Sequence, residues 1–187
     1  LFMAFGAEES GLLGSQAFAE RPTLPLDRLA AVLNLDVMNL FGATRDIAAL
    51  GADQSSLGSV FVTAARAEGL AVTTDSAGLI RGSFFRSDHF PLARAGVPAL
   101  SVESGRSFVG KPEDWGAEQT RDYTATRYHQ PQDEMVPWYS MDGALQQLRV
   151  VLRTAVLVAT APEQPSWNPE SEFRAAGQER LRSLPSH

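Results

Sequence analysis

The sequence contains no cysteine, which excludes disulfides, thiolate metal ligands and a thiol nucleophile. A transition metal in this protein would have to be bound by histidine, aspartate and glutamate. Histidine is also scarce, because the 187 residues include only His89, His129 and the chain-terminal His187. The search for an imidazole that binds a metal or transfers a proton therefore has two serious candidates, His89 and His129.

Long apolar runs and an excess of positive charge are missing as well. No run approaches the ~20 apolar residues that a membrane-spanning helix needs, and Arg153 interrupts the most apolar segment, VVLRTAVLVATA. A net charge of −6 and a pI near 5.1 argue against nucleic acid or an anionic membrane as a partner. The length and the apolar content of 44% are typical of one globular domain with a substantial core.

Short apolar segments alternate along the chain with segments of helical periodicity. This alternation predicts an α/β fold, with three α/β/α layers and a mostly parallel, mixed central sheet. Residues 104–137 break the pattern, and we interpret them as a long, ordered and functional loop. Strands are expected at residues 1–5, 31–37, 46–52, 70–74 and 97–102, and helices at about 12–20, 26–31, 55–68, 91–95 and 140–160.

The chain divides into a catalytic-domain part, residues 1–161, and a polar tail, residues 162–187. The tail has few apolar residues, so its helix, at about 170–183, is expected on the surface or trailing into disorder. The last domain helix is expected to bury one apolar stripe: Met141, Leu145, Leu148, Leu152, Ala155 and Ala159. The chain begins inside a segment that reads as a core strand, and we expect residues upstream of Leu1 in the intact protein.

Acidic residues follow two of the apolar segments. Glu8 and Glu9 come directly after the first, and Asp36 lies near the carboxyl end of the second. In open α/β sheets the loops at this edge form the ligand-binding crevice, so these carboxylates can share one space. His129, on the aromatic-rich loop, could close it. Taken alone, Glu8 and Glu9 could equally be acids in the first turn of a helix.

Carboxylates together with one imidazole suit Zn²⁺, with Mn²⁺ or Co²⁺ as alternatives. In this interpretation Glu9, Asp36 and His129 are the candidate metal ligands. Glu8, adjacent to a ligand, could take a proton from water that the metal has made acidic. The predicted chemistry is metal-assisted hydrolysis.

Four segments together resemble the di-zinc aminopeptidase family, typified by secreted bacterial leucyl aminopeptidases and yeast aminopeptidase Y. They are FMAFGAEESGLLGS, NLDVMN, RSDHFPLARAGVPAL and YHQPQDE, in the order and rough spacing of that family. The resemblance implies a zinc-exopeptidase fold, two zinc ions and hydrolysis of the N-terminal peptide bond of peptide substrates. It also implies a periplasmic or secreted location rather than a cytoplasmic one.

The resemblance also implies individual roles. Glu8 would be the general base, Glu9 and His129 would bind one zinc, and Asp36 would bind the other. Residues near the substrate or supporting the ligands would be Asp88, His89, Phe90, Tyr128 and Asp133.

One departure from the family matters for activity. The family uses a further histidine and a metal-bridging aspartate that precede the segment equivalent to Glu8, and this sequence contains neither. Metal affinity falls steeply when ligands are removed, so we expect this chain alone to bind zinc weakly or partially and to be inactive. The assignment as a metallo-aminopeptidase therefore applies to the intact protein.

Three other functions remain open at this point. Glutaminyl cyclases resemble the same family but use a single zinc, which Glu9 and His129 could help to hold. Carboxypeptidases of related fold differ in the peptide terminus that enters. A non-catalytic binding or dimerisation module on the same scaffold is the third alternative. The sequence does not indicate the oligomeric state.

Overall fold

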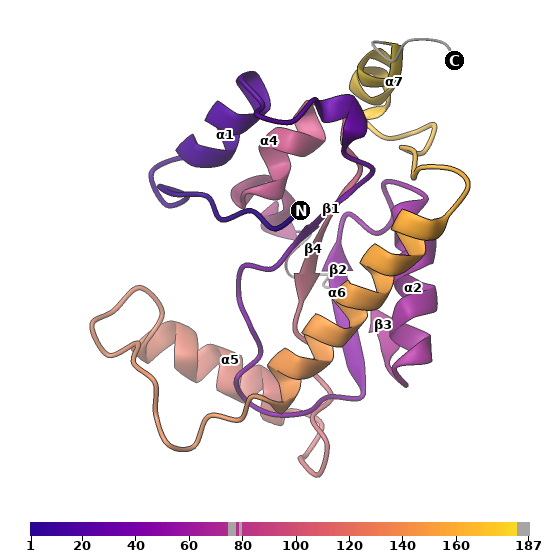
Figure 1. Ribbon diagram of the computed structural model, residues 1–187. Helices are drawn as coiled ribbons and strands as arrows, with labels where there is room; N and C mark the ends of the chain where they lie inside the picture. The colour runs from indigo at the N-terminus through magenta and orange to yellow at the C-terminus, as the bar shows by residue number, and fades with distance from the viewer. Residues whose placement is uncertain (75–77, 79, 183–187) are drawn as a thin grey trace.

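The computed structural model describes residues 1–74, 78 and 80–182 and contains a four-stranded sheet flanked by helices (Figure 1). The strand order is β1-β4-β2-β3. β1 pairs with β4 and β2 with β3 in parallel, whereas β2 and β4 are antiparallel. The predicted fold class is therefore confirmed. The strands are β1 Val32–Asn34, β2 Asp46–Leu50, β3 Ala71–Thr73 and β4 Ala99–Glu103.

Helices cover both faces of this sheet. α2 and α6 pack against each other on one face, and α4 lies on the other face, where it contacts β1, β4 and α1. The α-helices are α1 Leu13–Glu20, α2 Leu57–Ala67, α4 His89–Arg94, α5 Trp115–Thr126, α6 Asp142–Thr160 and α7 Arg174–Arg182, and the 3-10 helices are η1 Leu26–Arg28 and η2 Ser83–Arg86.

Each face of the sheet has its own hydrophobic core, because side chains alternate along a strand. In β4, Leu100 and Val102 point toward α2 and α6, where Phe61 is fully buried. Ala99 points the other way and packs with Phe84. The second core lies beneath α4 and therefore supports the segment that carries the predicted residues Asp88, His89 and Phe90.

The strand predicted at residues 1–5 is wrong. This segment is not part of the sheet, and the side chains of Leu1 and Phe2 are 83% and 102% exposed. A strand is stable only when its backbone pairs with a neighbour. Beside residues 1–5 the described part of the chain supplies no strand, since β1 pairs only with β4.

The interpretation of residues 104–137 as one long loop is also wrong. Twelve of them, Trp115–Thr126, form α5, which extends to one side of the sheet (Figure 1). Among the residues of α5 only Gly116 is buried, so the helix has no apolar stripe. Hydrophobic periodicity, the main sequence signal for a helix, is therefore absent.

α6 is present where it was predicted, but it buries a different face. Its buried residues are Gly143, Ala144, Gln147, Val150 and Thr154. The predicted stripe faces outward: Met141, Leu145, Leu148 and Leu152 are 46–64% exposed. The helix carries two apolar faces, and packing against α2 selected the one with the smaller side chains, which allows a close approach.

The tail is more firmly attached than its composition indicated. Trp167 and Phe173 are buried in the core beneath α4, and Arg180 of α7 is 7% exposed. The predicted end of the tail helix at Ser183 and the terminal His187 lie outside the described residues. None of the helices in the described ranges is long and apolar enough to cross a bilayer.

Candidate active site

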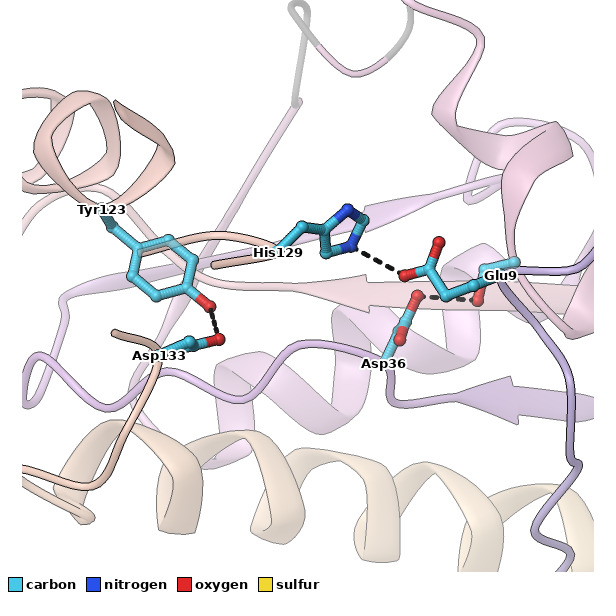
Figure 2. Close-up of polar contacts among 6 residues, drawn as sticks. Glu9, Asp36, Tyr123, His129 and Asp133 are labelled. Atoms are coloured by element: carbon cyan, nitrogen blue, oxygen red, sulfur yellow. Dashed lines mark hydrogen bonds and ion pairs between the residues drawn. The ribbon is translucent and has the colours of Figure 1, made fainter. Parts of the chain in front are cut away.

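The four residues predicted to carry the chemistry come together in space. Glu9 Oε1 lies 2.8 Å from His129 Nε2, although 120 positions separate them in the chain. Figure 2 shows the carboxylate of Asp36 directed toward the same space as Glu9 and His129. Asp36, Glu9, Asp88 and His129 all act on the pKa of Glu8. The convergence expected from the sequence therefore occurs, even though residues 1–5 are not a strand.

The turn that presents Glu8 and Glu9 is built by the backbone. Gly11 N and Leu12 N both donate to the carbonyl of Glu8, at 3.0 and 2.8 Å, and Leu12 is the N-cap residue of α1. Ala7 and Leu12 adopt φ values of +59°, in the left-handed region that is costly for residues with a side chain. The acids are held in a tight turn ahead of a helix rather than at the tip of a strand.

The carboxyl group of Glu8 lies among other charged groups. Burial raises the pKa of its carboxyl group above the ordinary value, and the negative charges of Asp36, Glu9 and Asp88 raise it further, while His129 opposes them. A carboxylate whose pKa is raised toward neutrality accepts and returns a proton more readily. The neighbouring carboxylates therefore help tune Glu8.

Asp36 is oriented by a serine that the sequence analysis did not select. The hydroxyl of Ser87 donates to Asp36 Oδ2 at 3.0 Å and accepts a hydrogen bond from Asn34 Nδ2 at 2.9 Å. Ser87 is 7% exposed, whereas Asp36 is exposed. Ser87 directly precedes Asp88 in the RSDHF segment, so that motif was the available signal.

The side chains of the three residues that follow Ser87 in the RSDHF segment have different surroundings. Asp88 turns toward α1, where it accepts a hydrogen bond from the buried Ser15 hydroxyl at 2.7 Å. His89 is fully buried against Phe84, and burial lowers the pKa of its ring to about 4. The Phe90 ring contacts Phe85. Asp88 therefore borders the site, while His89 belongs to the core beneath it.

Tyr128 and Asp133 flank His129 in the loop after α5. The Tyr128 ring stacks on the His129 imidazole, with centroids 3.8 Å apart, and is 44% exposed. Burial, followed by the charges of Glu9 and Asp36, raises the pKa of the Tyr128 phenol. Asp133 accepts a hydrogen bond from the Tyr123 hydroxyl at 2.8 Å (Figure 2). Tyr123 is a second supporting residue that the sequence analysis missed.

The donor set matches a zinc site in chemistry but not in number. Glu9 and His129 could bind one ion together, and the Asp36 carboxylate is directed toward the same space (Figure 2). Their side chains are open to solvent, at 72% for Glu9 and 54% for His129. Within the described ranges no group of three or more histidine and acidic side chains is arranged to hold a metal ion. The described residues alone therefore do not form a complete metal site.

The model of peptidase family M28 matches residues 1–155 of the sequence. The chain belongs to peptidase family M28. This confirms the resemblance drawn from the four sequence motifs, and the matched range includes every predicted site residue. α7 and the segment that leads to it lie beyond the match.

Among solved structures, the chain is similar to an aminopeptidase from Aneurinibacillus sp. strain AM-1, with a TM-score of 0.51 and 23% sequence identity. The similarity covers 88% of this chain and 34% of that aminopeptidase, so the chain spans about a third of its length. At this level of identity the likeness supports the fold. No protein with a curated description is similar enough to the chain to count as a match.

Proposed function

We propose that this chain contributes part of the catalytic centre of a metal-dependent aminopeptidase, which hydrolyses the N-terminal peptide bond of peptides. The observation that carries the proposal is the 2.8 Å contact between Glu9 and His129, with the Asp36 carboxylate directed toward the same space (Figure 2) and the charges of all three acting on Glu8. In this assignment Glu9 and His129 hold one zinc ion, and Asp36 is a ligand of a second. Membership of a peptidase family supports the reaction class.

Glu8 performs the proton transfers in this mechanism. A bound metal ion would supply Lewis-acid chemistry, which polarises a peptide carbonyl and makes water more acidic. The Glu8 carboxylate takes a proton from the attacking water as its oxygen bonds to the carbonyl carbon. When the C–N bond breaks, Glu8 returns that proton to the departing amine. Glu8 therefore acts as the base in the first step and as the acid in the second.

The Tyr128 ring stacks on His129, the charges of Glu9 and Asp36 act on its phenol, and the charge of Asp88 acts on Glu8. We propose that Tyr128 and Asp88 both contact the substrate. Phe90 packs against the core beneath α4, where its ring contacts Phe85 and Phe173. The open surroundings of Glu9 and His129 suit the entry of a peptide end.

The 187-residue chain alone should bind zinc weakly and lack peptidase activity. Glu9, His129 and Asp36 are three donors for two metal positions, whereas a catalytic zinc normally has three protein ligands of its own. We therefore place the activity in the full natural protein that contains these residues. Its location in the periplasm or outside the cell is proposed from the family resemblance alone.

A single-zinc glutaminyl cyclase is the second candidate, because the Glu9–His129 pair would serve one zinc equally well. Asp36, as a ligand of a second metal, favours the peptidase without deciding between the two proposals. Its carboxylate is oriented by Ser87 toward the same space, as a ligand of a second metal would be. Two zinc ions per chain favour the peptidase, whereas one zinc with formation of pyroglutamate favours the cyclase.

The decisive substitution is Glu8→Gln, which keeps the shape of the side chain and removes its ability to take a proton. In the full natural protein it should lower kcat for release of an N-terminal residue by about 10²–10⁴-fold, with zinc content near that of the wild type. Glu20→Gln, an exposed acid at the end of α1, is the matched control. Retained turnover in Glu8→Gln would remove Glu8 from this role. Zinc binding without turnover of any peptide by the wild type would instead favour a binding module.

A further inference from the structure

The backbone of His129 is in a conformation that needs outside support. Its φ is +58°, in the left-handed region, where a residue with a side chain is strained. Such conformations persist only when the surrounding structure fixes them, and they concentrate at functional sites. The side chain is half exposed, so burial of His129 itself does not provide this support.

α5, which leads into His129, offers little anchorage of its own. Gly116 is its only buried residue. Its first turn is held by the Trp115 ring against Phe108, with centroids 4.8 Å apart, at the end far from His129. The end next to His129 must be fixed by something else.

Phe41 contacts the end of α5 that lies next to His129. Its ring lies against three aromatic rings from both stems of the loop that carries His129: Tyr123 at 6.2 Å, Trp138 at 6.3 Å and Tyr139 at 5.9 Å between centroids. We call Phe41, Tyr123, Trp138 and Tyr139 the aromatic anchor. Of these four residues, Phe41 comes from a distant part of the chain, whereas the other three lie within residues 123–139.

Ring contacts lead from the aromatic anchor to the imidazole. The Tyr123 ring lies 6.1 Å from that of Tyr128, which stacks on His129 at 3.8 Å. The backbone N–H of Tyr128 donates to the carbonyl of Tyr123 at 3.0 Å. The Tyr123 hydroxyl also holds Asp133, on the far side of the turn. Movement of Tyr123 would therefore displace both flanks of His129.

Phe41 is itself firmly placed and closely connected to Asp36, five residues earlier. Its N–H donates to Asn39 Oδ1 at 3.0 Å, and the N–H of Asn39 donates to Gln147 Oε1 of α6 at 2.7 Å. Phe41 also forms a parallel bridge with Ser140, whose N–H donates to Leu40 O at 2.8 Å. One short segment thus carries Asp36 at its start and Phe41 at its end.

We propose that Phe41 is a positioning residue for His129: its ring clamps both stems of the 127–139 loop onto the segment that bears Asp36. By positioning His129, Phe41 sets the affinity for the metal that Glu9 and His129 hold. This consequence rests on the proposed function. Phe41 touches neither substrate nor metal in this account.

The first test uses the 187-residue chain and needs no metal. Stacking on Tyr128 shifts the NMR signals of the His129 ring protons away from the values of a free imidazole. In Phe41→Leu these signals should move toward the free values, and the loop amides should exchange faster with solvent. Phe41→Tyr, which retains the ring, should restore the wild-type spectrum. Phe85→Leu, which removes an exposed ring near α4, is the matched control and should leave the His129 signals in place.

The second test uses zinc competition with a chromogenic chelator on the full natural protein. Phe41→Leu should weaken zinc binding at one of the two sites by about 10–100-fold, as loss of a ligand-orienting partner does. The other site of this variant should keep the wild-type affinity. Both sites of the control variant Phe85→Leu should also keep it. Equal weakening of both sites would indicate general destabilisation and overturn the proposal. Unchanged His129 signals in Phe41→Leu would overturn it as well. If the His129 signals change in Phe41→Leu but the wild-type protein binds no zinc, the positioning role of Phe41 is supported and the proposed function is rejected.

Discussion

Arg180 provides the sharpest test of the structure outside the active site. This residue lies in α7, beyond the range matched by the family, and is 7% exposed. Its guanidinium donates to three backbone carbonyls: Gly96 O at 3.0 Å, Leu26 O at 3.0 Å and Leu29 O at 2.8 Å. It thereby joins the tail to the end of α4 and to η1. Burial lowers the pKa of Arg180, because removing the guanidinium from water disfavours its charged form and offsets part of the stabilisation from these hydrogen bonds.

The expected cost of Arg180→Met follows from what each carbonyl retains. Gly96 O also accepts from Trp167 Nε1, and Leu26 O also accepts from the N–H of Leu29. Leu29 O, which is partly buried, therefore loses most, at up to about 1–3 kcal/mol, the cost of an acceptor left without a donor. Methionine keeps the apolar stem packed. We expect the free energy of unfolding to fall by about 2 kcal/mol, which lowers Tm by roughly 4–8 °C in a chain of this size.

Urea unfolding followed by circular dichroism measures this difference. Arg182→Met is the matched control, because Arg182 lies on the same helix and its side chain is 73% exposed in a pair with Glu179. An exposed pair of this kind contributes less than about 1 kcal/mol. Equal stability of Arg180→Met and Arg182→Met would contradict the docking of the tail that we describe.

Two further predictions concern the core. Lowering the pH from about 6.5 to 4 should reduce the free energy of unfolding by up to about 3 kcal/mol through His89. The unfolded chain takes up a proton near the ordinary pKa of histidine, whereas the buried ring does so only at a pKa of about 4. In urea titrations the free energy of unfolding should depend less steeply on pH in His89→Gln than in the wild type, and an equal dependence would refute this. Gly58→Ala should cost more than 2 kcal/mol, because its Cβ would lie 1.8 Å from Ala52 O; a wild-type Tm for Gly58→Ala would contradict the packing of α2.

The approach of Glu9 to His129 could be predicted, because short motifs identified both residues without knowledge of the local backbone. The link between Glu9 and His129 followed from strand ends, one aromatic loop and the family resemblance. The supporting residues could not be found in this way. Phe41 and Tyr123 are ordinary aromatic residues in the sequence, and their importance arises from a contact between segments about 80 residues apart.

The errors in the fold share one physical cause, which is the choice among alternatives that only tertiary contacts make. Residues 1–5 have the composition of a strand but lack a paired neighbour in the described structure. α6 has two apolar faces, and contact with α2 decides which one is buried. Trp167 and Phe173 anchor the tail, although its mean composition is polar. Composition and periodicity describe what a segment can do, and packing selects among those options.

Anomalous diffraction at the zinc edge, on crystals of the full natural protein grown with zinc, tests the central claim most directly. We predict a zinc peak about 2.0–2.2 Å from both a Glu9 carboxylate oxygen and His129 Nε2, with Asp36 bound to a second peak. In that state the direct contact between Glu9 and His129 is replaced by shared ligation. A zinc ion held by other residues, with Glu9 and His129 still paired to each other, would contradict the assignment.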